Sequence, residues 1–362
     1  MTGGRLIGHE IVTIYCHFSS LFENVCWYCV TTRNKGILDN LSKTSVPIVD
    51  RGSICKAADI VRSGGLVAFP TETVYGLGAD ASNDEAVASL FAVKERPSFN
   101  PLIVHVPRRN SLEDVARCDA RSLSLADRFW PGPLTMVLPR SADSNVSWLA
   151  SSGLDTVAVR MPDHSVALEL LAKVNGPVVA PSANMSGSVS PTTAEHVQES
   201  LKWGVEMIID GGPCRIGIES TVISLVDNVP CILRPGGISR EVLEEEIGAI
   251  VSNKINGLSP LAPGMLESHY APSRPVRINV TEVMPGEALL AFGPSQLASD
   301  SESLNLSPSG DLEEAASNLF SMLRRLDRAE FVAVAVMTIP ESGIGRAIND
   351  RLRRAAATPL TP

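Results

Sequence analysis

The sequence lacks the short motifs by which many nucleotide-binding proteins and hydrolases are found. Its 362 residues contain no G-x-x-x-x-G-K-[ST] phosphate loop and no G-x-G-x-x-G turn. No Ser-His-Asp arrangement and no histidine cluster with metal-ligand spacing can be found either. These absences argue against the common phosphate-loop and dinucleotide folds. If the protein handles an anion such as a nucleotide, the groups that bind it must be dispersed along the chain.

Disulfide spacing and excess positive charge are also lacking. The seven cysteines are odd in number and irregularly spaced, which argues against a disulfide framework and for a reducing compartment. One C-x-x-C pair, Cys26 and Cys29, has no second pair or histidine partner, so zinc or redox chemistry there is the weaker interpretation. A net charge of -9 argues against a protein that coats nucleic acid through its overall field, although a local basic groove stays open.

A long uninterrupted apolar run is missing as well. The most apolar N-terminal stretch is interrupted by His17, Glu23 and Asn24, unlike a membrane span or a secretory signal. An organelle presequence is an alternative, but Glu10 and Glu23 count against it. We therefore expect a cytoplasmic protein without a membrane anchor, in which residues 1–43 form an extension of unknown order.

Residues 44–252 predict a mixed sheet with helices packed on it. Short runs rich in valine and leucine, such as 66–70 and 134–138, indicate buried strands. Residues 84–96 have acidic residues at their start and basic residues at their end, which suits a helix. Strands and helices do not alternate strictly, so a simple doubly wound domain is not expected. We predict an α/β (α+β) fold for this part of the chain.

The rest of the chain predicts a linker and a second, smaller domain. Residues 253–275 are rich in proline, glycine and serine, as linkers are, and the serine-rich segment 299–311 is predicted to be an exposed loop. The other predicted elements are two core strands and two helices, over 288–293, 331–337, 311–327 and 345–357. Their order favours a small parallel α/β domain over 276–362.

Polar side chains gather where the predicted strands end. Thr71 and Thr73 follow one strand, Arg160 lies on or just after another, and Ser182 and Ser220 stand beside two more. Hydroxyl groups, backbone amides and guanidinium groups are the usual partners of phosphate oxygens and carboxylates. The pattern therefore predicts an anion-binding cleft.

Each of these residues also has a plainer interpretation when it is taken alone. A threonine such as Thr73 after a strand is commonly a turn or cap residue. Arg160 could belong to an ion pair, and His105 could be a core histidine with satisfied hydrogen bonds. Lys94 and Arg96 could complement the C-terminus of a helix.

The ordered set of motifs resembles one family. "FPTETVYGLGADA", "KERPSFNPLIVHV", "FWPGPLTMVL", "VAVRMP", "PVVAPSANMSG" and "IIDGG…GIESTVISL…ILRPG" occur in this order and together closely resemble the YrdC-like family of threonylcarbamoyl-AMP synthases. "LAPGMLESHYAP" resembles the linker of the long, two-domain form, and "GIGRAINDRLRRAA" resembles its C-terminal domain. The resemblance runs from about Ile54 to the end. It implies a YrdC-like twisted mixed sheet over 44–252, a linker or lid over 253–275 and a small Rossmann-like domain over 276–362.

The resemblance also implies a reaction, nucleotidyl transfer. L-threonine, bicarbonate and ATP, with Mg2+ as cofactor, would give threonylcarbamoyl-adenylate and diphosphate. The product would pass to a tRNA threonylcarbamoyl-transferase system, which modifies the adenosine next to the anticodon. A weak affinity for RNA is compatible with this role.

Site residues are carried over from the family position by position, and the metal ligands are left unknown. The catalytic residues would be Lys94 and Arg96. The threonine site would comprise Thr73, His105, Arg160, Ala180 and Ser220. The ATP site would comprise Arg96, Asn100, Thr156, Ser182, Ser190, Arg234 and Tyr270.

Two other functions stay open from the sequence. A non-catalytic protein that binds double-stranded RNA would use the arginines to follow the RNA backbone, although the acidic net charge counts against it. A related carbamoyl-transferring enzyme would use carbamoyl phosphate, but its acylphosphatase and zinc-finger segments are not found here.

Overall fold

The computed structural model describes residues 47–252 and 269–357. The predicted N-terminal extension and most of the predicted linker lie outside the described residues. Ser45–Pro362 belong to one compact unit, which does not include the residues before Ser45. Within the described ranges, no helix has both the length and the apolar character that a bilayer crossing needs.

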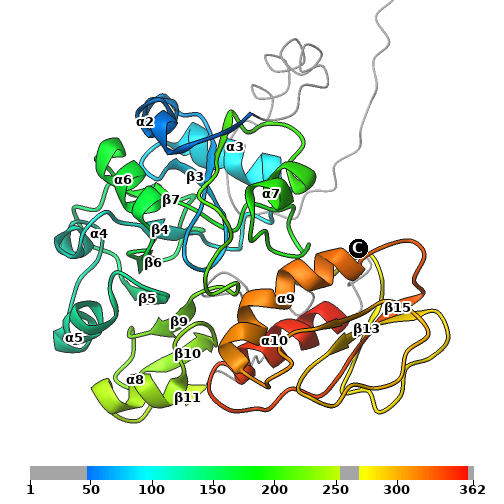
Figure 1. Ribbon diagram of the computed structural model, residues 1–362. Coiled ribbons are helices and arrows are strands. Elements are labelled where there is room, and N and C mark those ends of the chain that lie inside the picture. Colours follow the sequence, from blue (N-terminus) through cyan, green and yellow to red (C-terminus); the bar gives the residue numbers. More distant parts are fainter. Residues whose placement is uncertain (1–46, 253–268, 358–362) are drawn as a thin grey trace, which may run out of the picture. The chain divides into compact units, whose positions relative to one another are not determined.

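The larger sheet has 11 strands within the described residues, and their directions are mixed (Figure 1). Neighbouring strands β4 and β6 run parallel, as do β5 and β9, whereas β5 and β6 run antiparallel. The predicted mixed sheet is therefore confirmed. In spatial order the strands are β1 (Ile48–Val49), β8 (Met207–Ile209), β2 (Val67–Phe69), β3 (Gly76–Asp80), β7 (Val178–Val179), β4 (Ile103–His105), β6 (Thr156–Arg160), β5 (Leu134–Pro139), β9 (Thr221–Ser224), β10 (Cys231–Arg234) and β11 (Val251–Ser252).

Helices of this domain begin and end where the sequence supplies caps. The side chain of Asn83 accepts hydrogen bonds from the amides of Glu85 and Ala86 at the start of α3, and Glu95 ends this helix in the left-handed conformation. Because the helix ends at Glu95, Arg96 is the first residue after the helix. The helices are α2 (Ile54–Arg62), α3 (Asp84–Lys94), α4 (Leu112–Val115), α5 (Ala120–Phe129), α6 (Ser165–Val174), α7 (Ala194–Ser200) and α8 (Arg240–Ile247), with short 3-10 turns at Arg51–Ser53 and Arg109–Ser111.

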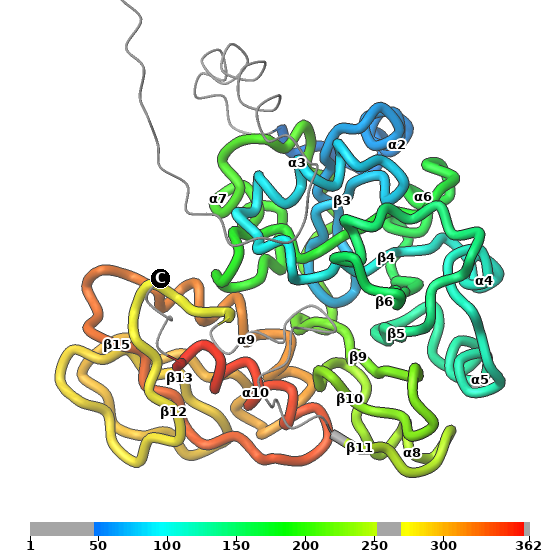
Figure 2. The backbone as a smooth tube through the Cα atoms, turned by 180° about the vertical axis from the view of Figure 1, so that it is seen from behind, coloured from blue at the N-terminus to red at the C-terminus, as the bar shows by residue number. Residues whose placement is uncertain are grey.

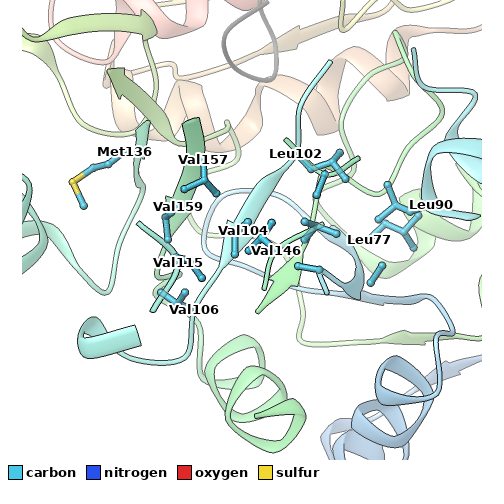
Figure 3. Close-up of a cluster of buried hydrophobic side chains, with 14 of the residues drawn as sticks. Leu77, Leu90, Leu102, Val104, Val106, Val115, Met136, Val146, Val157 and Val159 are labelled. Carbon is cyan, nitrogen blue, oxygen red and sulfur yellow. The ribbon is translucent and has the colours of Figure 1, made fainter. Parts of the chain in front are cut away.

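Apolar side chains fill both faces of the large sheet. On one face, Leu77 and Val104 pack with Leu90 of α3 and with Val157 and Val159 of β6, as Figure 3 shows. On the other face, α2 and α6 cover β2, β7 and β8. Burial of a leucine or valine side chain contributes about 1.5–3 kcal/mol. This packing holds the strand ends that carry the polar residues.

The smaller sheet has strands in the order β12 (Val276–Ile278), β15 (Ala333–Val336), β13 (Glu287–Ala291) and β14 (Ser303–Asn305), and all of its pairs are parallel. Figure 2 shows β12, β13 and β15 of this sheet. Helices α9 (Leu312–Leu326) and α10 (Gly345–Ala356) contact each other and share one hydrophobic core with the strands. The predicted small parallel α/β fold is confirmed, whereas the domain limits at 44–252 and 276–362 stay a prediction.

One local expectation differs from the structure. The segment 299–311, predicted as a loop, contains β14, which needs few apolar residues because it is an edge strand and partly exposed. Gly76 and Gly78, which by residue type suit either a turn or close packing, lie inside β3. A Cβ atom on Gly78 would lie 2.8 Å from the Phe69 ring, so close packing explains this glycine.

Candidate active site

Strand register brings the predicted polar residues to one end of the large sheet. His105 of β4 lies opposite Arg160 of β6, and Arg160 lies opposite Thr135 of β5 on its other side. The hydroxyl groups of Thr135 and Ser220 lie 2.8 Å apart, which places Ser220 beside the same strands. These side chains surround a small cavity of about 50 Å³. The cavity is lined by Val74, Arg96, Ile103, His105, Arg160, Ala180, Pro181, Ser182, Glu219, Ser220, Arg234, His269 and Tyr270.

Buried guanidinium groups dominate the charge around this cavity. Arg96 donates to the carbonyl oxygens of Asn100 (3.1 Å) and Pro101 (3.0 Å), and Arg234 donates to the Ser220 carbonyl oxygen at 2.9 Å. Burial, followed by repulsion from Arg234, lowers the pKa of Arg96 to about 9. An anion would relieve this repulsion, so the cluster is suited to phosphate or carboxylate groups.

Arg160 forms the ion pair that its plainer interpretation suggested. Its Nη2 atom lies 2.7 Å from Oε1 of Glu72, and both side chains are buried. The two atoms do not meet the geometry of an aligned hydrogen bond. The neighbouring His105 is neutral, because burial and then Arg160 lower its pKa to about 3. A ligand carboxylate at Arg160 would therefore meet one paired guanidinium and one uncharged imidazole.

Lys94 does not line the cavity, although it is buried. Its Nζ atom donates to the carbonyl oxygens of Ser182 (2.5 Å) and Asn184. Burial and then the charge of Arg96 hold the pKa of Lys94 well below its usual value. In this structure Lys94 holds the chain around Ser182 in place, and its predicted catalytic role stays a prediction.

Four other predicted residues lie outside the cavity lining. Thr73 is hydrogen-bonded to Thr71 (2.8 Å), and Ser190 donates to Glu219 (2.6 Å). Thr156 lies at the opposite end of β6 from Arg160. The side-chain amide of Asn100 is fully buried and has no hydrogen-bond partner among the described residues, which leaves it able to bind a ligand. Their predicted roles are not tested by these positions.

His269 and Tyr270, at the end of the predicted linker, line the cavity. The Tyr270 ring is fully buried and stacks on Phe320 of α9, with ring centroids 5.5 Å apart. The Tyr270 backbone has φ of 63°, an uncommon value for a residue with a side chain. Burial lowers the pKa of His269 to about 3, so this histidine is neutral too.

Two charged residues of the site were not predicted to have a role there. The sequence alone suggests that Glu219 caps a turn or pairs with a surface base, whereas Arg351 belongs to a helical motif without an assigned role. Arg351 lies on the apolar face of α10, three residues after Ile348 and next to Leu352, and both neighbours are buried. An arginine on the apolar face of a predicted helix indicates a buried ion pair, and this signal was present in the sequence.

Comparisons with known proteins identify the family of the chain. A family model described as "Threonylcarbamoyl-AMP synthase, C-terminal domain" matches residues 238–357, and one described as "Telomere recombination" matches residues 59–236. The threonylcarbamoyl-AMP synthase of Bacillus subtilis (strain 168) is 42% identical over 84% of this chain and 92% of its own length. The chain belongs to the threonylcarbamoyl-AMP synthase family. The threonylcarbamoyl-AMP synthase of Pyrococcus abyssi is 44% identical over 85% of this chain and 95% of its own.

A solved structure agrees with this family. The crystal structure of P. abyssi Sua5 complexed with L-threonine has a TM-score of 0.80 and 41% sequence identity, and the match covers 86% of this chain and 98% of that chain. The predicted resemblance to the synthase family and the predicted fold class are both confirmed. Membership in the synthase family does not favour the alternative of a non-catalytic RNA-binding protein.

Proposed function

We propose that the protein converts L-threonine, bicarbonate and ATP into threonylcarbamoyl-adenylate and diphosphate. The observation that carries this proposal is the group of buried arginines, Arg96, Arg160 and Arg234, around one cavity in a member of the synthase family. Arg96 and Arg234 would bind the nucleotide, and Arg160 would bind the amino acid. The product would then pass to a tRNA threonylcarbamoyl-transferase system, which uses it on the adenosine beside the anticodon.

The threonine end of the cavity would be formed by Arg160, His105, Ala180 and Ser220. The guanidinium of Arg160 would bind the threonine carboxylate while it keeps its ion pair with Glu72. The P. abyssi Sua5 with L-threonine bound supports this assignment, because it has the same fold. A hydroxyl group that bonds to the threonine side chain would discriminate against valine, which leaves that group without a partner.

The nucleotide end would be formed by Arg96, Arg234 and Ser182. Threonine and bicarbonate give a carbamate with loss of water, and the anionic carbamate oxygen attacks the α-phosphorus of ATP. The bond between the α-phosphorus and the bridging oxygen breaks, and diphosphate leaves. Such a nucleophile needs no strong general base, so alignment and charge neutralisation are the main tasks of the site. The buried arginines supply both.

Mg2+ fits this site only together with the phosphates. Among residues 47–252 and 269–357, no group of three or more potential metal ligands is found. The two carboxylates near the cavity, Glu72 and Glu219, are each paired with an arginine. Mg2+ commonly binds through one or two carboxylates, water and substrate phosphates. We propose that Mg2+ enters with ATP, where it would neutralise part of the phosphate charge.

The described conformation leaves little free space at the site. Its cavity of about 50 Å³ is far smaller than ligand pockets, which are typically about 300–1,000 Å³. His269 and Tyr270 lie at its wall, beside the arginines proposed to bind ATP. We propose that residues 253–275 form a lid, and that His269 and Tyr270 withdraw to admit the nucleotide.

Release of diphosphate tests the proposed reaction directly. We expect release to require ATP, Mg2+ and bicarbonate, and to be much faster with threonine than with valine. Equal rates with the two amino acids, or release without bicarbonate, would contradict the proposal. A tight, salt-dependent affinity for double-stranded RNA without nucleotide turnover would favour the alternative function.

A further inference from the structure

An arginine from the smaller domain reaches the site on the larger one. Arg351 of α10 has no exposed side-chain surface. Its Nε atom lies 2.8 Å from Oε2 of Glu219, and its Nη1 atom donates to the Pro235 carbonyl oxygen at 2.9 Å. Its guanidinium carbon lies 5.2 Å from the centre of the Tyr270 ring. One side chain therefore contacts a cavity residue, the chain after β10 and Tyr270.

Glu219 is the partner that makes this contact relevant to ligand binding. It lines the cavity, and its Oε1 atom accepts a hydrogen bond of 2.6 Å from Ser190. Burial would raise the pKa of Glu219, but Arg351 and then Arg234 outweigh this and hold the pKa below its usual value. Glu219 therefore carries a negative charge inside a cavity that is proposed to bind a polyphosphate.

A carboxylate beside phosphates would repel them unless its charge is balanced. A buried ion pair that loses one partner leaves an uncompensated charge in a medium of low polarity. Arg234 also lies near Glu219, but its guanidinium donates to the carbonyl oxygen and hydroxyl group of Ser220. Arg351 forms a direct ion pair with Glu219. A carboxylate oxygen of Asp350, the residue before Arg351, lies 2.8 Å from Nη1 of Arg351.

We propose that Arg351, which the C-terminal domain supplies, is a positioning residue of the nucleotide site. It neutralises Glu219 and holds it in place, so that this carboxylate can orient Ser190 without repelling the phosphates of a nucleotide. The proposal rests on the proposed function, since ATP is taken as the nucleotide. It gives the C-terminal domain a task in the active site beyond control of the lid, because the site has its balanced charge only when α10 is in place.

The test is calorimetric titration of ATP into variants of the full chain. Arg351→Met removes the charge but keeps similar length, and Arg353→Met is the matched control. Arg353 lies two residues further along the same helix, has 53% of its side chain exposed and pairs with the exposed Glu341. We expect Arg351→Met to weaken ATP binding about tenfold or more, because charge-assisted contacts are of that order. We expect Arg353→Met to bind ATP as the unaltered protein does.

A second substitution separates charge balance from packing. The double variant Arg351→Met/Glu219→Gln should bind ATP within about threefold of Glu219→Gln alone, because position 219 is then uncharged and Asp350 keeps its ion pair with Arg354. If the double variant binds ATP as poorly as Arg351→Met, the arginine acts through packing and the proposal is wrong. Unchanged or tighter ATP binding by Arg351→Met would overturn it as well. Arg351→Gln provides the same comparison if Arg351→Met does not fold.

Threonine binding and diphosphate release distinguish this proposal from the reaction itself. Threonine should bind Arg351→Met about as it binds the unaltered protein, since Arg160 and His105 do not contact Arg351 through any described hydrogen bond or ion pair. Parallel loss of threonine and ATP binding would indicate a collapsed site and count against a positioning role. If the unaltered protein binds ATP but releases no diphosphate, the proposed reaction fails, whereas the result for Arg351 stands.

Discussion

At the scale of single residues, the buried arginines have different partners and therefore different expected roles. Arg160 is paired with the carboxylate of Glu72, whereas Arg96 donates only to backbone carbonyl oxygens within the part of the chain that the structure describes. We expect Arg160→Ala to weaken mainly threonine binding and Arg96→Ala to weaken mainly ATP binding or the chemical step. Loss of a charge-assisted contact costs about 1.5–3 kcal/mol, or roughly 10- to 150-fold in affinity. Calorimetry with each ligand alone measures this, and identical effects on both ligands would contradict the assignment.

The hydrogen bonds of the buried Lys94 lead to a prediction about the stability of the protein. Its ammonium group satisfies two buried carbonyl oxygens, and Lys94→Met would leave both without this donor. We expect the variant to lose about 1–3 kcal/mol of unfolding free energy, the usual penalty for an unsatisfied buried polar group. Urea unfolding measures the loss, with Lys56→Met at an exposed helical position as the control. If the two variants are equally stable, the hydrogen bonds of Lys94 contribute little.

At the scale of elements, the proposed lid over 253–275 can be tested through Tyr270. Tyr270 is held by the Phe320 ring and by Arg351, whereas its hydroxyl group has no hydrogen-bond partner among the described residues. We expect Tyr270→Ala to let the adenylate escape or hydrolyse faster, because the ring no longer excludes water. Tyr270→Phe keeps the ring and should behave as the unaltered protein. Chromatography of the adenylate over time measures both, and equal decay in the three proteins would show that residues 253–275 act only as a tether.

At the scale of the whole molecule, the buried neutral histidines make stability depend on pH. Burial lowers the pKa of His105 and of His269 to about 3, whereas the unfolded value is about 6.5. Between these values the unfolded chain binds more protons than the folded one, so the free energy of unfolding falls as pH is lowered. The loss is roughly 1 kcal/mol per histidine and pH unit below about 6.5.

Urea unfolding at several pH values measures this dependence. We expect His269→Gln to reduce the slope of unfolding free energy against pH between about 6 and 4 relative to the unaltered protein. Lys56→Met, at an exposed helical position, serves as the control and is expected to leave the slope unchanged. An equal slope in all three proteins would mean that His269 takes up its proton in the folded state as easily as in the unfolded one.

Local sequence patterns determined much of the secondary structure and the class of the site. Buried runs such as 134–138 formed strands, and the cap at Asn83 and the charges at the ends of α3 formed a helix. Edge strand β14 could not be predicted, because a partly exposed strand needs no apolar run. Glycines in β3 were ambiguous, since the same residue type serves turns and close packing.

The partners of the charged residues were decided only by the tertiary structure. Arg160, Arg96 and Glu219 could be recognised as polar groups near strand ends, but the sequence alone could not say which of them pair. Glu219 and Arg351 are 132 positions apart, and their contact depends on α10 meeting the chain after β8. Ion pairing requires two charges a few ångströms apart, and the spacing of residues along a chain does not contain that distance. The motifs therefore determined the family and the chemistry, whereas folding determined which charges are balanced and that Tyr270 lines the cavity.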